Sequence, residues 1–387
     1  MSINTDLLVI GAGPGGYAAA FRAADLGKKV TIIEREAELG GVCLNKGCIP
    51  SKTLLHLGKV VDEALDLKNQ GIIFSKPKID YKKIQSSKNK IIKKLNAGVK
   101  YLAKQRNVDI IQGNADFISD SSVKIKKANK SEIISFDHCI IATGSRPKEL
   151  KEITIDHKNI LDSTSALNLD DIPKKILIIA GGYIGLEMGS IFSSMGSSVI
   201  VAEFMPSLLP MADQDLVSIL KKKLDSKVES IVMNTSVSEF KQNKNSITVT
   251  LNINKEKTQS IKFDKVLVSI GRIPNTDELS LENIGIEVNK NGFIIVDEYQ
   301  RTNIPNIMAI GDVTGDPMLA HKAAHEGKVA AEVSCNIATA FEPNAIPAVI
   351  FTDPEIAWAG KTEQECINEN IKYEKGEWNR SESFLKV

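Results

Sequence analysis

The sequence has 387 residues, which is enough for two or three domains with sizeable cores and excludes a small fold held together by disulfides. Its 49 lysine and arginine residues nearly balance 48 aspartate and glutamate residues, so the net charge of +1 provides no overall field that attracts nucleic acid or an anionic membrane. Hydrophobic residues at 42% and charged residues at 25% are typical of globular proteins, and no apolar run approaches the roughly 20 residues that cross a bilayer.

The first elements along the chain form a strand-turn-helix-strand unit. Asp6–Ile10 is predicted to be a buried strand, Gly11–Gly16 a glycine-rich turn, and Tyr17–Leu26 a helix that ends at Gly27. Val30–Glu34 is predicted to be the second strand. The residues before the first strand are polar and lack the features of a signal peptide, so we expect a cytoplasmic protein.

Two cysteines, Cys43 and Cys48, follow this unit with four residues between them. Such a close pair in an intracellular protein is typical of redox or metal chemistry. Zinc would need two further ligands and only His56 lies nearby, so we expect no metal site. In redox exchange one thiol attacks an external disulfide and the other resolves it, and Lys46 or Lys52 would favour the thiolate. A structural disulfide, or two ordinary buried thiols, is the alternative.

The middle of the chain predicts one long helix and a group of short strands. Tyr81–Gln105 is rich in lysine, and its apolar residues recur at helical spacing, so its charges are interpreted as a solvated face. Ile110–Gly144 is predicted to supply short strands. Later strands, over Phe263–Ile270 and Ile304–Ile310, each end at a glycine, and after Pro343 the pattern changes to short segments separated by prolines.

The strand-turn-helix-strand order occurs a second time. Lys175–Ala180 is the strand, Gly181–Gly185 the turn, Leu186–Met195 the helix and Ser198–Glu203 the second strand. Two copies of this unit predict an α/β fold with two Rossmann-like dinucleotide-binding domains.

The first copy has the residues that a dinucleotide site requires. Gly11, Gly13 and Gly16 allow a tight turn, close approach of a pyrophosphate, and close packing of helix on strand, and Pro14 and Gly15 complete the turn. Phosphates would lie at the helix N-terminus, where the N–H groups and the dipole favour negative charge. Glu34, at the end of the second strand, would accept hydrogen bonds from a ribose.

The second copy differs at its first position, where Ala180 replaces glycine. If the turn requires a positive φ there, a Cβ atom is costly. Gly181, Gly182 and Gly185 provide the remaining glycines, with Tyr183 and Ile184 between them. Glu203 takes the place of Glu34, and its charge would repel the extra phosphate of NADP, so NAD is the predicted nucleotide.

Two dinucleotide sites and a dithiol together predict an electron relay between NAD(H), a flavin, the dithiol and an external disulfide. With these motifs in this order, nearly the whole chain resembles the flavin-dependent pyridine nucleotide-disulfide oxidoreductases, so FAD and NAD are the expected cofactors. The resemblance implies that Cys43 exchanges with substrate, that Cys48 lies against the flavin, and that Lys52 and Glu187 form a pair beside the flavin ring.

The resemblance also implies the remaining cofactor contacts. Those expected for the flavin include Gly41, Val42, Cys43, Lys52, Ala115, Thr143, Gly144, Ser145, Asp312, Met318, Leu319, Ala320 and His321. Those expected near NAD include Glu187, Val237, Gly271 and Arg272. The helix start at Met318–His321 would lie beneath the flavin, where its dipole would stabilise the reduced, anionic ring.

Two motifs are similar to those of family members that oxidise protein-bound dihydrolipoamide with NAD. They are Cys-Leu-Asn-Lys-Gly-Cys-Ile and Met-Leu-Ala-His-Lys-Ala. The resemblance therefore implies lipoyl domains of 2-oxo acid dehydrogenase complexes as partners. The alternatives are an NADH diaphorase or oxidase, another disulfide reductase similar to mercuric reductase, and a noncatalytic docking subunit.

The resemblance implies a division into a flavin domain at 1–148 and 271–342, an NAD domain at 149–270, and the start of an interface domain at 343–387. In the family that third domain forms a homodimer and supplies a His–Glu acid–base pair. About 45 residues are too few for a domain of roughly 100. We therefore expect a truncated chain whose dimer is in doubt and whose dihydrolipoamide oxidation is impaired, because general base catalysis contributes about 10²–10⁴-fold.

Overall fold

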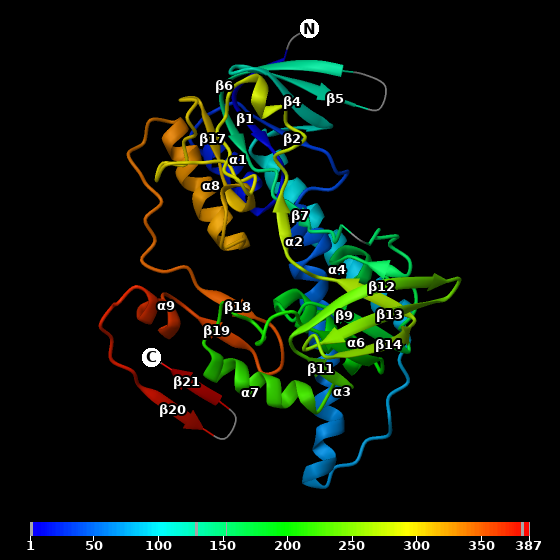
Figure 1. The fold of residues 1–387 in the computed structure, drawn as a ribbon. Helices are drawn as coiled ribbons and strands as arrows, with labels where there is room; N and C mark the ends of the chain where they lie inside the picture. Colours follow the sequence, from blue (N-terminus) through cyan, green and yellow to red (C-terminus); the bar gives the residue numbers. More distant parts are fainter. Residues whose placement is uncertain (1–2, 128–130, 152, 381–382, 387) are drawn as a thin grey trace. The chain divides into compact units, whose positions relative to one another are not determined.

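The computed structural model describes residues 3–127, 131–151, 153–380 and 383–386 and forms two compact units (Figure 1). Unit 1 comprises Met1–Pro50, Lys83–Lys148 and Gly271–Pro343. Unit 2 comprises Ser51–Lys82, Glu149–Ile270 and Asn344–Val387. Each unit is therefore assembled from three separate stretches of sequence.

Unit 1 is built on a mixed sheet in which the strands follow the order β3-β2-β1-β6-β5-β4, with β17 paired to β6. The first three strands, β6 and β17 run parallel, whereas β4 and β5 are antiparallel to their neighbours. The strands of this sheet are β1 (Ile3–Ile10), β2 (Val30–Glu34), β3 (Asp109–Gln112), β4 (Asn114–Ser119), β5 (Ser122–Lys126), β6 (Ser131–Ile141) and β17 (Ile307–Ala309).

Helices and short segments cover and connect this sheet. They are α1 (Pro14–Asp25), α2 (Gly41–Lys46), the start of α3 (Cys48–Asp66), most of α4 (Tyr81–Gln105), the two-stranded pair β7 (Ser145–Pro147) and β16 (Arg272–Pro274), the 3-10 helices η2 (Leu281–Asn283) and η3 (Gly311–Thr314), and α8 (Ala320–Ser334). Helices α1 and α8 lie against each other, and a Cβ atom at Gly327 of α8 would come within 2.5 Å of the carbonyl oxygen of Gly15. Glycine at this contact therefore lets the two helices approach closely.

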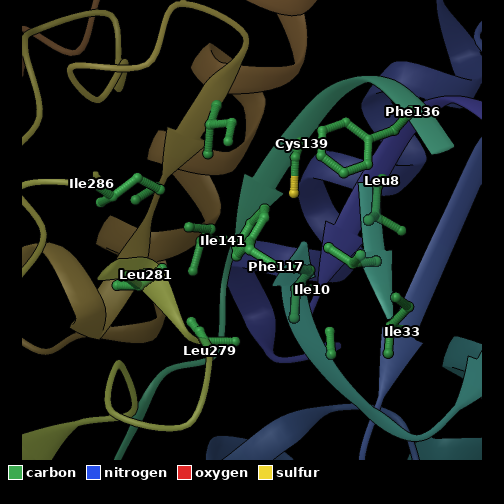
Figure 2. Packing of buried hydrophobic residues seen from close by; sticks show 14 of the residues in the cluster. Leu8, Ile10, Ile33, Phe117, Phe136, Cys139, Ile141, Leu279, Leu281 and Ile286 are labelled. Carbon is green, nitrogen blue, oxygen red and sulfur yellow. The ribbon is translucent and has the colours of Figure 1, made fainter. Parts of the chain in front are cut away.

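One face of the unit 1 sheet is covered by a hydrophobic core (Figure 2). Phe117 and Phe136 meet edge to face with ring centroids 6.4 Å apart, and Cys139 lies among them, fully buried. Burial raises the pKa of the Cys139 thiol, so this cysteine is a core residue with no thiolate chemistry. The chain 271–343 contributes Leu279, Leu281 and Ile286 to the same core, which ties the last segment of unit 1 to the first.

Unit 2 contains a parallel sheet of order β11-β10-β9-β15-β8 and an antiparallel sheet of order β12-β13-β14. The strands are β8 (Ile160–Leu161), β9 (Lys175–Ile179), β10 (Ser198–Ala202), β11 (Ser230–Val232), β12 (Thr235–Asn243), β13 (Ser246–Ile253), β14 (Lys257–Phe263) and β15 (Lys265–Val268). The other elements are η1 (Leu67–Gln70), α5 (Ser163–Ala166), α6 (Tyr183–Ser194), α7 (Gln214–Asp225), β18 (Ala348–Ile350), β19 (Ile356–Trp358), α9 (Glu363–Asn368), β20 (Glu377–Arg380) and β21 (Ser383–Lys386).

The predicted α/β class with two Rossmann-like sheets is confirmed. The helices of the two copies were expected at Tyr17 and Leu186, but they begin earlier, at Pro14 and Tyr183. Proline fits the first helical position because its N–H is not needed there, so the end of the glycine turn already belongs to the helix. Among the described residues, no helix is long and apolar enough to span a membrane.

Candidate functional site

The glycine turn between β1 and α1 excludes a side chain at Gly11 but not at Gly13. Gly11 has φ of 103°, and a Cβ atom on it would collide with the carbonyl of Ala142. At Gly13, by contrast, the nearest atom to a Cβ would be the Cα of Gly41 at 3.9 Å. The turn is therefore tight on the sheet side and open at Gly13, as the approach of a phosphate requires.

The acidic residue after each glycine turn is buried and holds that turn. In unit 1, Glu34 accepts hydrogen bonds from the N–H groups of Ala12 at 2.7 Å and Glu36 at 3.0 Å. In unit 2, Glu203 accepts from the N–H groups of Gly181 at 2.5 Å and Met205 at 2.6 Å. A carboxylate has about four lone-pair sites, so each still has acceptor capacity for ribose hydroxyls.

The helices that follow the two turns have open N-termini in the described structure. Neither α1 nor α6 has a capping side chain or an acidic residue in its first turn. By contrast, the short helices α5 and α9 begin with capping boxes at Asp162 and Thr362, whereas α2, α7 and α8 also lack a capping side chain. At the starts of α1 and α6 there is thus no capping side chain and no acidic side chain that would compete with an anion such as a pyrophosphate.

Ala180 occupies the position in unit 2 that Gly11 occupies in unit 1. Its φ is 81°, so the positive φ that the turn was expected to require is present in a residue with a side chain. This conformation is unfavourable for alanine. The second dinucleotide turn thus has the same shape as the first but carries local backbone strain.

The two cysteines lie at the junction of two helices. Cys43 is in α2, Cys48 is the first residue of α3, and both are half-buried. A helix N-terminus favours negative charge at Cys48. Burial raises the pKa of the hydroxyl of Tyr17 in α1, and the charges of Cys43 and Cys48 raise it further. Sequence reasoning did not select Tyr17, because its position in the sequence reads as an ordinary helix residue.

Asn45, between the cysteines, is braced from α4. Its amide donates to the carbonyl oxygens of Leu39 at 2.9 Å and Gly41 at 3.1 Å. Its side-chain oxygen accepts from Asn96 Nδ2 at 2.6 Å, and Asn96 is 3% exposed. The conformation of the segment that carries the cysteines is therefore fixed by side-chain hydrogen bonds as well as by α2. Neither asparagine was predicted as functional.

Lys52 and Glu187, predicted to be a pair, are brought together in unit 2. The Lys52 ammonium lies 2.9 and 3.1 Å from the two carboxylate oxygens, and the side chains are 32% and 6% exposed. Phe351, which was not predicted, supports both. Its N–H donates to Glu187 Oε1 at 3.1 Å, and its ring centroid lies 4.3 Å from Lys52 Nζ. Lys52 is also four residues after Cys48 on α3, so the two share one side of that helix.

Asp312 is held by residues from two other segments of unit 1. Its carboxylate accepts from Ser145 Oγ at 2.5 Å, and that hydroxyl in turn accepts from Arg272 Nε at 2.7 Å. Next to them, Thr143 Oγ1 donates to the carbonyl of Asn275 at 2.7 Å. Arg272, expected near the NAD site, is thus directed at Ser145 within unit 1.

The other predicted residues are placed as follows. The residues expected to contact the flavin lie in unit 1 apart from Lys52, and those expected near NAD lie in unit 2 apart from Gly271 and Arg272. Ala115 is buried in β4, Val237 is half-buried in β12, and His321 is exposed in the first turn of α8. In the described part of the chain, no group of three or more histidine, cysteine, aspartate or glutamate side chains could hold a metal ion.

The residues of unit 1 fit FAD. The open space at Gly13, the uncapped start of α1 and the spare acceptor sites on Glu34 suit a pyrophosphate and a ribose. In unit 2, the uncapped start of α6 suits a pyrophosphate and Glu203 suits a ribose, so these residues fit NAD. The described residues thus form two nucleotide-type cradles and one dithiol.

Comparison with known proteins supplies independent evidence. A family model described as pyridine nucleotide-disulphide oxidoreductase matches residues 5–327. The chain is 47% identical over 381 residues to the dihydrolipoyl dehydrogenase of Buchnera aphidicola, covering 98% of this chain and 80% of the relative. It is 44% identical to the same enzyme of Vibrio parahaemolyticus and 45% identical to that of Geobacillus stearothermophilus, each covering 96% of this chain and 78% of the relative.

A solved structure is also similar. The copper(II) complex of the HOCl-induced flavoprotein disulfide reductase RclA from Escherichia coli superimposes with a TM-score of 0.83 at 28% sequence identity. The match covers 95% of this chain and 80% of that chain.

Proposed function

The chain belongs to the pyridine nucleotide-disulphide oxidoreductases, and we propose that within this family it oxidises protein-bound dihydrolipoamide with NAD, as a dihydrolipoyl dehydrogenase. The observation that carries the proposal is the pair Cys43 and Cys48, at the junction of α2 and α3, in a chain with two dinucleotide cradles. The identity to dihydrolipoyl dehydrogenases over nearly the whole chain supports this substrate over other disulfides.

The cysteines carry out the exchange with substrate. A thiolate of dihydrolipoamide attacks Cys43 Sγ, which breaks the Cys43–Cys48 disulfide and releases Cys48 as a thiolate. The second thiol of the substrate, as a thiolate, then attacks the substrate sulfur that is bonded to Cys43 Sγ. This breaks the mixed disulfide, closes the ring of lipoamide and releases Cys43 as a thiolate. Two protons leave the substrate thiols, and two electrons remain on the cysteine pair. The N-terminus of α3 favours the negative charge that Cys48 acquires.

Bound FAD supplies the two-electron step that connects the dithiol to NAD. The chain contributes the geometry for this step. Glu34 and the start of α1 bind the flavin nucleotide, and Glu203 and the start of α6 bind NAD. The pair Lys52 and Glu187, which Phe351 supports, places a fixed positive charge one helical turn from Cys48.

The partners follow from the substrate. Dihydrolipoamide linked to protein is carried by the lipoyl domains of 2-oxo acid dehydrogenase complexes, and these are the proposed partners. The division into a flavin domain at 1–148 and 271–342, an NAD domain at 149–270 and the start of an interface domain from 343 is likewise proposed. The uncapped helix starts on each side of position 149 support it.

The test is formation of NADH from NAD and dihydrolipoamide by the FAD-loaded chain. We expect NADH to form only with FAD present, and both Cys43→Ser and Cys48→Ser to abolish it, because each removes one sulfur of the exchanging pair. Cys139→Ser is the control, since that cysteine is buried in the core of unit 1. Unchanged NADH formation by either serine variant of the pair would refute the proposal.

A further inference from the structure

Helix α8 carries two charged side chains in the interior of unit 1. Lys322 is 7% exposed and Glu326 is 4% exposed, and their Nζ and Oε1 atoms are 2.8 Å apart. Burial raises the pKa of Glu326, and the neighbouring Lys322 ammonium opposes that rise. Buried charges are costly unless they are paired and hydrogen-bonded, so the further contacts of this pair show what it holds.

Both residues contact η3, the short turn that contains Asp312. The second carboxylate oxygen of Glu326 accepts from the N–H of Gly311 at 2.7 Å, immediately before Asp312. The Lys322 ammonium lies 3.3 Å from the carbonyl oxygen of Gly315 and 3.4 Å from Thr314 Oγ1. The pair therefore holds the turn at its beginning and at its end.

The side chain of Asp312 in the same turn is held separately. Its carboxylate accepts a hydrogen bond from the Ser145 hydroxyl, and that hydroxyl accepts one from Arg272. Asp312 thus has its backbone fixed from α8 and its carboxylate fixed from β7 and β16. Two independent supports on one half-buried functional group are typical of a pre-organised binding residue.

We propose that Lys322 and Glu326 are positioning residues that fix Asp312 for the polyhydroxylated chain of the flavin cofactor. This inference rests on the FAD assignment made under the proposed function. Sequence reasoning did not find the pair because a lysine and a glutamate four residues apart on a helix read as an ordinary surface ion pair.

The first test shortens the side chain at position 326 without removing its negative charge. Glu326→Asp keeps a carboxylate beside Lys322 but is one methylene shorter, so it loses the bond to the Gly311 N–H. We expect the dissociation constant of FAD from the apoprotein, measured by fluorescence titration, to rise by about tenfold, because the lost hydrogen bond has a charged acceptor and such bonds are the stronger ones. Ser334→Ala changes another buried polar residue of α8, whose hydroxyl donates to the carbonyl of Ala331 and lies near Cys335 Sγ, and should leave FAD affinity unchanged.

The second test separates pairing from folding. Glu326→Gln leaves the Lys322 cation buried without its carboxylate, whereas Lys322→Met with Glu326→Gln leaves no buried charge and keeps an acceptor for Gly311. We expect Glu326→Gln to weaken FAD binding by tenfold or more and the double variant to recover most of that loss. Urea unfolding of each apoprotein identifies the part of any change that is purely structural.

The outcomes are distinguishable. Weakened FAD binding in Glu326→Asp, together with recovery in the double variant, supports the inference. FAD affinity equal to that of the unchanged chain in both Glu326 variants, with only the urea midpoint altered, would overturn it. An unchanged chain that binds no FAD at all would overturn the proposed function, and the inference with it.

Discussion

At the level of single residues, the Cβ atom of Ala180 is unfavourable for the backbone conformation of the second glycine turn. The sequence predicted a cost if the turn needs a positive φ, and the structure has φ of 81° there. The size of that cost depends on the neighbours of the turn, which the sequence does not reveal. Gly11, in the equivalent turn, has no such conflict.

Replacing Ala180 with glycine should therefore stabilise the protein. Ala180→Gly removes the strained side chain, and we expect the free energy of unfolding to rise by about 0.5–1 kcal/mol, measured by urea denaturation of the apoprotein. The matched control is Gly11→Ala, which should lose stability because its Cβ would collide with the Ala142 carbonyl. Equal or lower stability of Ala180→Gly would show that the turn tolerates alanine without strain.

Glu203 has two tasks that the sequence could not separate. It was predicted to select NAD, and the structure shows that it also satisfies the N–H groups of Gly181 and Met205. Hydrogen bonds of this kind depend on how the chain after β10 returns to the glycine turn, and that return is a tertiary feature.

Glu203→Gln should lower the preference for NADH over NADPH by about tenfold, since it removes the charge that repels the extra phosphate. It should also cost about 1–3 kcal/mol of stability, because the amide can accept from only one of the two N–H groups. Titration of the chain with each nucleotide measures the first effect. Equal losses of affinity for NADH and NADPH would mean that the charge of Glu203 does not select the nucleotide.

At the element scale, strong patterns predicted their elements well. β2 at Val30–Glu34 and α4 at Tyr81–Gln105 have the predicted bounds, because a run of buried β-branched residues and a long helical periodicity are local signals. The role of α4 was not predictable. Its contact with the redox segment depends on Asn96, and an asparagine in a lysine-rich helix reads as one more polar residue.

Asn96→Leu tests this role of α4. Leucine keeps the volume of the side chain but cannot donate to Asn45, so the segment between the cysteines should open more often. We expect faster hydrogen–deuterium exchange in the peptide 41–47 and several-fold faster alkylation of reduced Cys43. Asn89→Leu makes the same change at an exposed position of α4 and should alter neither. Unchanged exchange in Asn96→Leu would show that α2 alone fixes the segment.

At the scale of the whole molecule, the order of motifs predicted the α/β class and the cofactors, because glycine turns and acidic strand ends are local. The interleaving of each unit from three stretches, with Ser51–Lys82 grouped in unit 2, was not foreseen. Phe351 beside Glu187 and Glu326 beside Gly311 were missed for the same reason. Both contacts join residues that are close only after the sheets have formed.

The proposed activity requires electrons to pass between NADH and the pair Cys43 and Cys48. The most direct measurement adds NADH to the FAD-loaded chain without oxygen, alkylates the thiols, and identifies the labelled peptides by mass spectrometry. We expect Cys43 and Cys48 to resist alkylation before NADH is added and both to be labelled afterwards, and we expect omission of FAD to prevent the change. Reduction of a dye by NADH while the two cysteines stay unlabelled would rule out electron transfer to this pair and identify a diaphorase.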